Sequence, residues 1–147
     1  QGFVHDEASA FFGGLAGNAG LFSTARDVAR VYQMLLNGGE IDGQRYLSKE
    51  TCQLFTTETS KISRRGLGFD KPDADDPKKG NCAPAAPAEV YGHTGFTGTC
   101  AWVDPVNELV YVFLSNRIYP DVTNRKLNQL HIRERIQGAI YDAMKKK

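Results

Sequence analysis

The sequence predicts an α+β fold in which an antiparallel sheet of about three strands is flanked by helices. Residues 91–116 contain three β-forming runs that are separated by glycine and proline turn signals. Two other segments, near residues 24–37 and 124–144, repeat apolar residues at the spacing of a helix. The length of 147 residues suits one domain of ordinary size.

The overall composition argues against two classes of partner. The formal net charge is +1, so no strong positive field predicts binding to nucleic acid or to an anionic membrane. No apolar run approaches the roughly 20 residues that a membrane-spanning helix needs, and residues 1–12 lack the pattern of a signal peptide. We therefore expect a globular domain with no nucleic-acid partner and no membrane span.

Two long helices have clear signals. The first is predicted from about Thr24, whose hydroxyl can cap it, to Asn37, before a pair of glycines that can end it. Its apolar face, which we expect in the core, consists of Val28, Val31, Tyr32, Leu35 and Leu36. The second is predicted from Asn124 to about Met144. Its apolar side consists of Leu127, Leu130, Ile136, Ile140 and Ala143.

Shorter elements have local signals only. Asp42 and Gly43 indicate a tight turn, and Ser48 can cap a short helix that runs through Phe55. Residues 66–69 favour a short strand, whereas residues 1–22 favour a loop.

Residues 70–89 are predicted to form a long, solvated surface loop. They hold four of the chain's six prolines and show no helical or strand periodicity. The carboxylates of Asp73, Asp75 and Asp76 do not match the spacing of a calcium loop. This segment therefore predicts no metal site.

The cysteines predict no cofactor either. Cys52, Cys82 and Cys100 are too few and too scattered for a disulfide framework or a zinc site. We expect Cys52 and Cys100 to be buried structural residues.

The most informative stretch runs from Tyr91 to Pro105. Its three glycines at 92, 95 and 98 lack Cβ atoms, so the backbone here can approach another molecule closely. His93 and Thr94 lie between these glycines and are well placed to touch a ligand. A glycine-kinked edge strand without a ligand has the same pattern, because glycines within strands often mark bulges. The spacing alone leaves both interpretations open.

His93-Thr94-Gly95 resembles the third signature of the serine β-lactamase and penicillin-binding-protein superfamily, a Lys-Thr-Gly or His-Thr-Gly triplet on the strand beside the nucleophilic serine. Residues 13–25 and 33–39 are similar to the start and the end of one helix in class C-like β-lactamases and related esterases. Residues 102–105 and 109–116 are similar to the strand pair after the triplet. The similarity covers nearly the whole chain and is greatest to the β-lactamase-like domain found behind bacterial family 3 glycoside hydrolases.

The resemblance implies an acyl-enzyme mechanism. A serine in a Ser-x-x-Lys motif attacks a carbonyl, and a lysine or tyrosine takes its proton. His93 matches the first position of the triplet and is the catalytic candidate, while Thr94, Gly95 and Phe96 are the substrate-binding candidates. The N–H of Phe96 matches the strand's oxyanion donor, and one such donor contributes roughly 3 kcal/mol to the transition state.

Two signatures of the superfamily have no match in this chain. The segment closest to Ser-x-x-Lys runs from Ser23 to Arg26, but arginine stays protonated and cannot act as a base. The second signature, Tyr-x-Asn or Ser-x-Asn, is also absent. Because both precede the triplet in the superfamily, we expect residues 1–147 to be the C-terminal portion of a single β-lactamase-like domain, a truncated domain that lacks the nucleophile.

The functional expectation is the pocket-lining fragment of a serine hydrolase that acts on an ester, an amide or a β-lactam. Histidine has an ordinary pKa of about 6.5 and is mostly neutral at pH 7, so His93 in place of lysine favours an ester or peptide-like substrate. The alternatives are a non-catalytic accessory or binding module with the same fold, and an independent small domain with an accidental match. By resemblance alone, the protein is expected to be periplasmic or otherwise exported.

The resemblance also predicts an exposed sheet edge. In the superfamily, strands from the N-terminal part of the domain pair with the third strand, here Leu109 to Ser115. Without those partners this strand presents unpaired backbone groups, which are a template for another strand. We expect a homodimer through this edge, antiparallel about a two-fold axis. The alternative is that residues 2–4 fold back to cover it.

Overall fold

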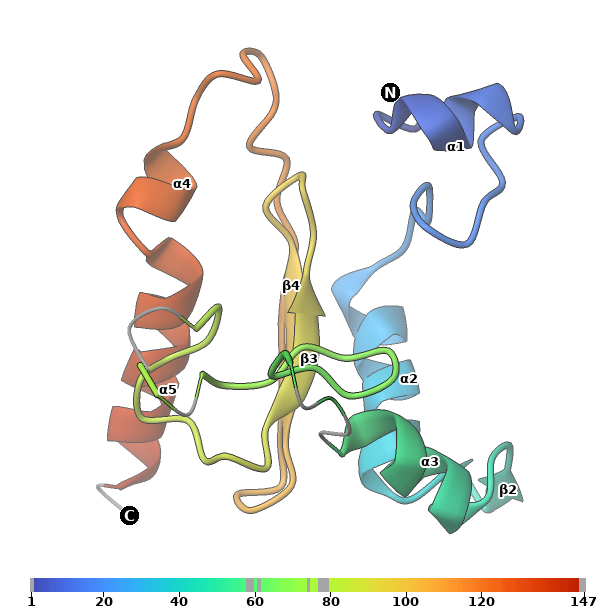
Figure 1. Cartoon of the computed structure of the whole chain (residues 1–147), viewed down its shortest axis with the longest axis vertical. Coiled ribbons are helices and arrows are strands. Elements are labelled where there is room, and N and C mark those ends of the chain that lie inside the picture. Colours follow the sequence, from blue (N-terminus) through green and yellow to red (C-terminus); the bar gives the residue numbers. More distant parts are fainter. Residues whose placement is uncertain (1, 58–59, 61, 74, 77–79, 146–147) are drawn as a thin grey trace.

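The chain forms three layers, with helices on both faces of a three-stranded antiparallel sheet (Figure 1). This computed structural model describes residues 2–57, 60, 62–73, 75–76 and 80–145. Helix α2 (Ala25–Leu36) lies against one face of the sheet, and helix α5 (Ile132–Met144) lies against the other (Figure 1). The predicted α+β class is confirmed.

The sheet has the strand order β3-β4-β5, with the bounds Tyr91–Thr94, Cys100–Asp104 and Leu109–Phe113. All three predicted strands are present, and the strand that carries the triplet lies at one edge, as expected. All five residues of the central strand β4 are buried. The predicted turn after β4 is held by Asp104, whose Oδ1 accepts hydrogen bonds at 2.9 and 3.0 Å from the N–H groups two and three residues later.

Helix α2 agrees with the prediction at both ends. The Thr24 Oγ1 accepts a hydrogen bond from the Asp27 N–H at 3.1 Å, and the glycines at 38–39 follow with positive φ angles. Tyr32 is half-buried, but Val31 is 55% exposed. The predicted burial of the whole apolar face is therefore wrong, because β4 and β5 cover only one side of the helix.

The predicted tight turn and short helix are confirmed. β1 (Glu40–Ile41) and β2 (Gln44–Arg45) pair around residues 42–43, which both have positive φ angles. Helix α3 spans Lys49–Thr56, and the Ser48 Oγ accepts a hydrogen bond from the third residue after it at 3.1 Å.

The predicted loop over residues 1–22 is wrong in part, because it contains helix α1 (Glu7–Phe11). Asp6 begins this helix by accepting hydrogen bonds from the Ser9 N–H at 2.8 Å and from Asn18 Nδ2 at 3.1 Å. These hydrogen bonds lower the pKa of Asp6. A helix of only five residues is too short to show an apolar stripe, which explains why periodicity missed it.

The segment from residue 66 to residue 89 differs from the prediction in two ways. Residues 66–69 form no strand, and only Asp70 pairs with Gly92 of β3. The loop that follows is irregular over its described residues, as predicted. The prediction that the whole loop is solvated is wrong, because four of its described residues are buried: Asp70, Lys71, Cys82 and Ala83.

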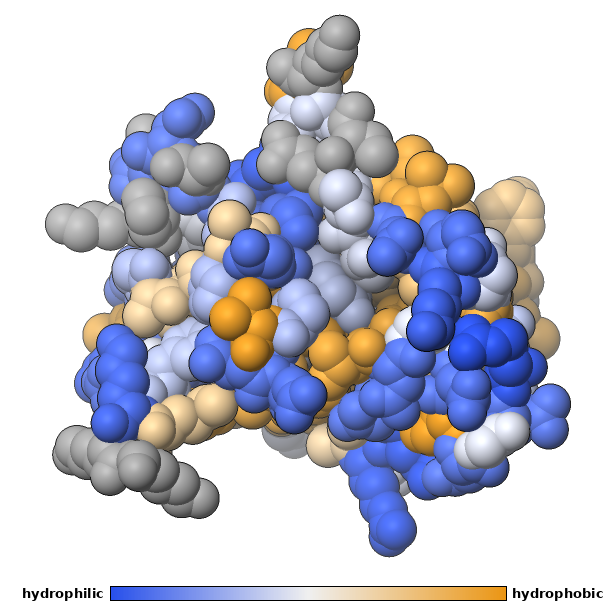
Figure 2. Space-filling model, turned by 90° about the horizontal axis from the view of Figure 1, so that it is seen from below, coloured by the Kyte–Doolittle hydropathy of each residue, from blue (hydrophilic) through white to orange (hydrophobic). Residues whose placement is uncertain are grey.

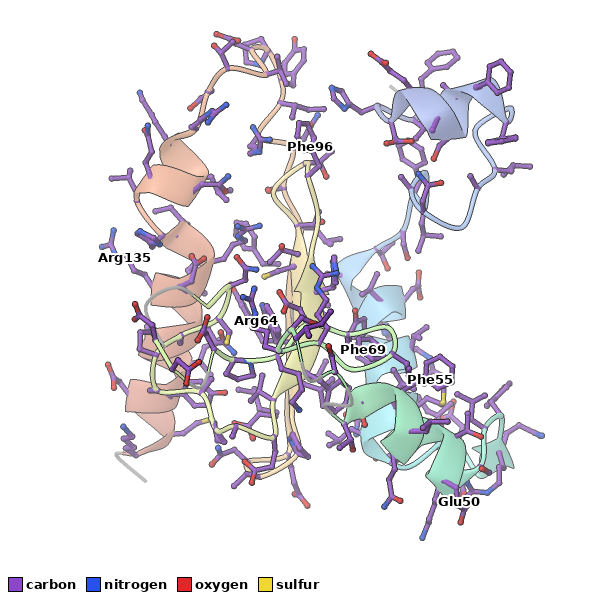
Figure 3. The ribbon with its side chains drawn as sticks, viewed as in Figure 1. Glu50, Phe55, Arg64, Phe69, Phe96 and Arg135 are labelled. Carbon is purple, nitrogen blue, oxygen red and sulfur yellow. The ribbon has the colours of Figure 1, made fainter. Side chains whose placement is uncertain are left out.

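The buried carboxylate of Asp70 is held by hydrogen bonds from two neighbouring side chains. Arg64, labelled in Figure 3, donates to both oxygens of Asp70 at 2.8 and 3.0 Å, and Asn81 donates at 2.9 Å. Burial alone would raise the pKa of Asp70, but these hydrogen bonds outweigh it and lower the pKa. Among the described residues, no group of three or more His, Cys, Asp or Glu side chains is arranged to hold a metal ion.

The predicted single helix from Asn124 to Met144 is broken. Helix α4 (Lys126–Gln129) and helix α5 are separated by His131, whose φ of 49° is left-handed. The residues of the predicted apolar side differ in burial: Leu130 is 53% exposed and Ile136 is 37% exposed, whereas Ile140 is partly buried and packs against the core.

Helix α5 instead buries a polar stripe of Arg133, Gln137 and Tyr141. The Oε1 of Gln137 accepts a hydrogen bond from the Ala83 N–H at 2.8 Å, and the Tyr141 hydroxyl donates to Asp104 Oδ2 at 2.8 Å. Because the polar ends of Gln137 and Tyr141 are hydrogen-bonded, these two side chains fill the space between helix and sheet at little desolvation cost. The buried Nε of Arg133 has no hydrogen-bond partner among the described residues.

The hydrophobic core lies between the sheet and α5 and contains Cys82, Val90, Cys100, Trp102 and Tyr111. All three cysteines are free and buried, which confirms the prediction for Cys52 and Cys100. Burial raises the pKa of Cys82 to about 12 and that of Cys100 to about 11. Both thiols are therefore protonated and unreactive at neutral pH.

The surface carries both polar and apolar side chains. Figure 2 shows one end of the molecule, which is mostly hydrophilic with separate apolar groups between the charged residues. Within the part of the chain that the structure describes, no helix is both long and apolar enough to cross a membrane.

Candidate active site

The triplet lies at the end of β3, on the open edge of the sheet. Residues 95–99, which we call the Phe96 turn, connect β3 to β4, and Phe96 lies at the tip of this hairpin in Figure 3.

The Gly95 N–H donates inward to the Thr99 carbonyl at 2.8 Å, whereas Gly92 bonds outward to Asp70. Because backbone groups alternate in direction along a strand, the N–H group of Thr94 points outward, like that of Gly92. Phe96 lies beyond β3, and its N–H is trans to the Gly95 carbonyl, which accepts a hydrogen bond from the Gly98 N–H at 3.0 Å within the turn. The Phe96 N–H therefore also points outward.

The Phe96 N–H is a candidate donor to a ligand. No acceptor among the described residues takes a hydrogen bond from it, and Phe96 is 63% exposed. An N–H group on an open strand edge can donate to a negatively charged oxygen that develops during a reaction.

His93 and Thr94 lie beside this amide. His93 is exposed, and its Nδ1 lies 2.7 Å from the Thr94 carbonyl oxygen. A carbonyl only accepts, so Nδ1 carries a proton and donates to it. Thr94 is half-buried, and within the described part of the chain its hydroxyl makes no hydrogen bond. Adjacent side chains of a strand point to opposite faces, so a ligand that contacts both must lie against the strand edge.

The three glycines lie close to atoms of neighbouring segments. A Cβ atom at Gly92 would overlap the Ala101 carbonyl oxygen of β4, and one at Gly95 would overlap the Thr99 hydroxyl. Gly98 has a φ of 99° and lies against the Ser115 hydroxyl. Close packing within the hairpin therefore requires these glycines, whether or not a ligand approaches.

Two further residues contact Phe96, and the sequence reasoning did not find them. The His5 ring stacks on the Phe96 ring at a centroid distance of 5.3 Å. The guanidinium of Arg117 lies 4.6 Å from the centroid of the same ring, and its Nε donates to the Phe96 carbonyl at 2.8 Å. The neighbour of His5, Asp6, has a structural role, because its side chain caps α1.

The nearest sequence to the nucleophile motif does not form a site. Ser23 is exposed, and its hydroxyl donates to the Thr24 carbonyl at 3.4 Å. Two cavities, of about 340 and 560 Å³, are lined by α3 and neighbouring segments, and neither is lined by residues 93–96. His93 and Phe96 are exposed, so this end of β3 is an open surface.

Comparison with known proteins gives these features a family context. Residues 2–134 match the family model described as Beta-lactamase. The chain is 38% identical over 128 residues to a protein of Escherichia coli O157:H7 named "Putative D-alanyl-D-alanine carboxypeptidase", and the match covers 86% of this chain and 29% of that protein.

Proteins with the same name from Escherichia coli strain K12 and Salmonella typhi are each 37% identical over 128 residues, again 86% of this chain and 29% of the relative. The chain thus spans less than a third of the length of these relatives. Because the family model matches most of the chain, the chain belongs to the beta-lactamase family.

Proposed function

We propose that this chain forms the substrate-binding wall of a serine hydrolase of the β-lactamase and penicillin-binding type, which acts through an acyl-enzyme. The observation that carries the proposal is the Phe96 N–H, which lies on the open edge of β3 beside the His-Thr-Gly triplet and has no acceptor among the described residues. Membership of the beta-lactamase family supports it.

Each residue of the wall has a role in this proposal. The Phe96 N–H donates to the oxyanion of the tetrahedral intermediate. The Thr94 hydroxyl, unpaired among the described residues, donates to a polar group of the substrate, and Gly95 lets the strand pack closely enough to present both groups. The exposed His93 ring lies at the rim and is oriented by the hydrogen bond from its Nδ1 to the Thr94 carbonyl. The nucleophilic serine and its base have no match in the printed sequence, and we place them in the rest of the full-length domain.

We propose a peptide that ends in D-alanyl-D-alanine as the substrate, with small esters as a second class. The names of the related enterobacterial proteins support this substrate. A neutral histidine in place of lysine agrees with a ligand held mainly by hydrogen bonds. The same names support a place in the cell envelope, and we propose the periplasm.

A non-catalytic accessory module is the second candidate function. The absence of Ser-x-x-Lys and Tyr-x-Asn from these 147 residues favours it. The full-length reading frame discriminates between the two candidates. Both motifs upstream of residue 1 support the enzyme, and their absence from the frame supports the accessory module.

The substitution Thr94→Val in the full-length protein tests the proposed site. It removes a hydroxyl while nearly keeping the shape of the side chain, so kcat/KM should fall roughly tenfold, about the value of one hydrogen bond to substrate. The free energy of unfolding should change by less than about 1 kcal/mol, because that hydroxyl bonds to no described residue. The control Thr57→Val, at an exposed position after α3, should change neither. An unchanged kcat/KM in Thr94→Val would remove Thr94 from the site.

We further propose that the chain, when isolated, dimerises through β5. No strand among the described residues pairs with the outer side of β5, so residues 2–4 do not cover it. The register pairs His93 with Ala101 and Ala101 with Val112. The N–H and C=O groups of Ala101 face β3, so Ala101 and Val112 exchange no backbone hydrogen bonds. The N–H and C=O groups of Val112 therefore point away from β4, along the free edge.

The substitution Val112→Pro tests this dimer. Proline removes an outward N–H without removing a hydrogen bond to β4, so it should convert the dimer to a monomer. Sedimentation velocity on the isolated chain measures this directly, and circular dichroism checks that the fold is kept. A monomeric unsubstituted chain, or a dimer that survives the substitution, would contradict the proposal.

A further inference from the structure

Arg117 lies outside the triplet but contacts the Phe96 turn through several groups. It follows β5, is half-buried, and reaches Phe96 through both its backbone and its guanidinium. We propose that Arg117 is a positioning residue that fixes the direction of the Phe96 N–H. This inference rests on the proposed function, because that function gives the N–H its role.

Arg117 holds the Phe96 turn at three points. Its Nε donates to the Phe96 carbonyl at 2.8 Å, and its Cζ lies 4.6 Å from the centroid of the Phe96 ring. Its own N–H donates to the Thr97 carbonyl at 2.9 Å. Two successive carbonyls and one side chain of the turn are therefore fixed by a single residue.

The guanidinium is itself anchored on its far side. Its Nη1 lies 3.3 Å from the Val122 carbonyl oxygen and 3.4 Å from that of Asn124 and donates to both. The Ser115 hydroxyl adds a hydrogen bond to the Thr97 carbonyl at 3.3 Å. The Phe96 turn is thus tied to the segment after β5, and only arginine has the planar, multi-donor group that can stack on a ring and bridge several carbonyls at once.

This anchoring matters because Phe96 is 63% exposed, so packing in the core does not fix the residue. Its other side-chain contact is the His5 ring, which stacks on it. The N–H of a residue turns with its backbone, and an oxyanion donor must lie within a narrow distance of the developing charge to be effective. The Phe96 N–H shares a peptide plane with the Gly95 carbonyl, which accepts a hydrogen bond from the Gly98 N–H at 3.0 Å. Fixing the ring and the carbonyl of Phe96 fixes its Cα and therefore the position of this N–H.

The test uses three variants of the full-length protein: Arg117→Met, Arg117→Lys and the matched control Arg135→Met. Arg135 is an exposed residue of α5 that lies far from Phe96 in Figure 3, and it loses the same charge. Arg117→Met should lower kcat for a nitrophenyl ester roughly 10- to 100-fold with little change in KM. Arg117→Lys should give an intermediate loss, because an ammonium can replace one hydrogen bond but not the ring contact and the bridge.

A transition-state analogue separates positioning from a general loss of structure. The inhibition constant of phenylboronic acid should rise in Arg117→Met by the same factor by which kcat/KM falls, whereas in Arg135→Met both should stay unchanged. Thermal unfolding checks that the variants are folded; if Arg117→Met does not fold, Arg117→Lys carries the test.

The outcomes distinguish this inference from the proposed function. If Thr94→Val is impaired but Arg117→Met and Arg117→Lys match the unsubstituted protein, only the role of Arg117 is overturned. If kcat falls without a matching rise in the inhibition constant, Arg117 acts elsewhere than on the oxyanion donor, which also overturns the inference. If the unsubstituted full-length protein turns over no substrate, the proposed function fails, and the role of Arg117 fails with it.

Discussion

The 147-residue chain on its own is expected to hydrolyse neither a chromogenic cephalosporin nor a short-chain nitrophenyl ester. It contains no Ser-x-x-Lys, and removal of the nucleophile from a serine hydrolase costs roughly 10⁶-fold in kcat. The oxyanion donor alone leaves only weak catalysis over water. Steady-state assays with the isolated chain and with the full-length protein, at equal concentration, measure the difference.

One result would show that the nucleophile lies within these residues after all. If the isolated chain turns over either substrate and Ser23→Ala abolishes that turnover, the assignment of the nucleophile to another part of the domain is wrong. Ser23 is the relevant serine because the segment from Ser23 to Arg26 is the nearest match to the motif.

The substitution Gly92→Ala is expected to lower the free energy of unfolding by at least about 3 kcal/mol. A methyl group at this buried position would overlap the Ala101 carbonyl oxygen and lie 2.8 Å from the Trp102 Cα. Both contacts belong to the backbone of β4, which cannot move without breaking the pairing with β3. Urea denaturation, followed by far-ultraviolet circular dichroism, measures the loss.

The matched control is Gly17→Ala. Gly17 is exposed, has no atom within 4 Å of the added methyl group, and does not have a positive φ. Its substitution should change the free energy of unfolding by no more than about 0.5 kcal/mol. Equal effects of the two substitutions would show that β3 and β4 are not packed as described.

The sequence predicted those elements whose signals are local. Thr24 and Ser48 cap their helices through N–H groups three residues away, and Asp104 closes the β4–β5 turn within three residues. In each case the side chain and its partner belong to the same few residues, so the pattern contains both halves of the interaction.

The sequence failed where the partner is distant. Gln137 is buried because it binds the N–H of Ala83, 54 positions away, and Tyr141 is buried because it binds Asp104, 37 positions away. Periodicity ranks residues by polarity, so it marked only the apolar side of this helix and gave no signal for these buried polar residues. No local pattern shows that a polar side chain will find its acceptor or donor in another segment.

The residues of the candidate site also fall into those with a local sequence signal and those brought together only by the fold. The triplet and Phe96 are found from residue types and spacing, and the structure adds that the Phe96 N–H lies on the open sheet edge. The contacts from His5 and Arg117 join Phe96 to distant parts of the chain. Only the folded arrangement brings these residues together.

The most direct test is a crystal structure of the full-length protein with phenylboronic acid, which forms a tetrahedral adduct with a nucleophilic serine. The proposal predicts one boronate oxygen at about 2.7–3.1 Å from the Phe96 backbone nitrogen, with the adduct beside Thr94 on the open edge of β3. An adduct whose oxygens all lie beyond hydrogen-bond distance of that nitrogen, or the absence of any adduct at a serine facing β3, would contradict the assignment of this strand as the wall of an acyl-enzyme site.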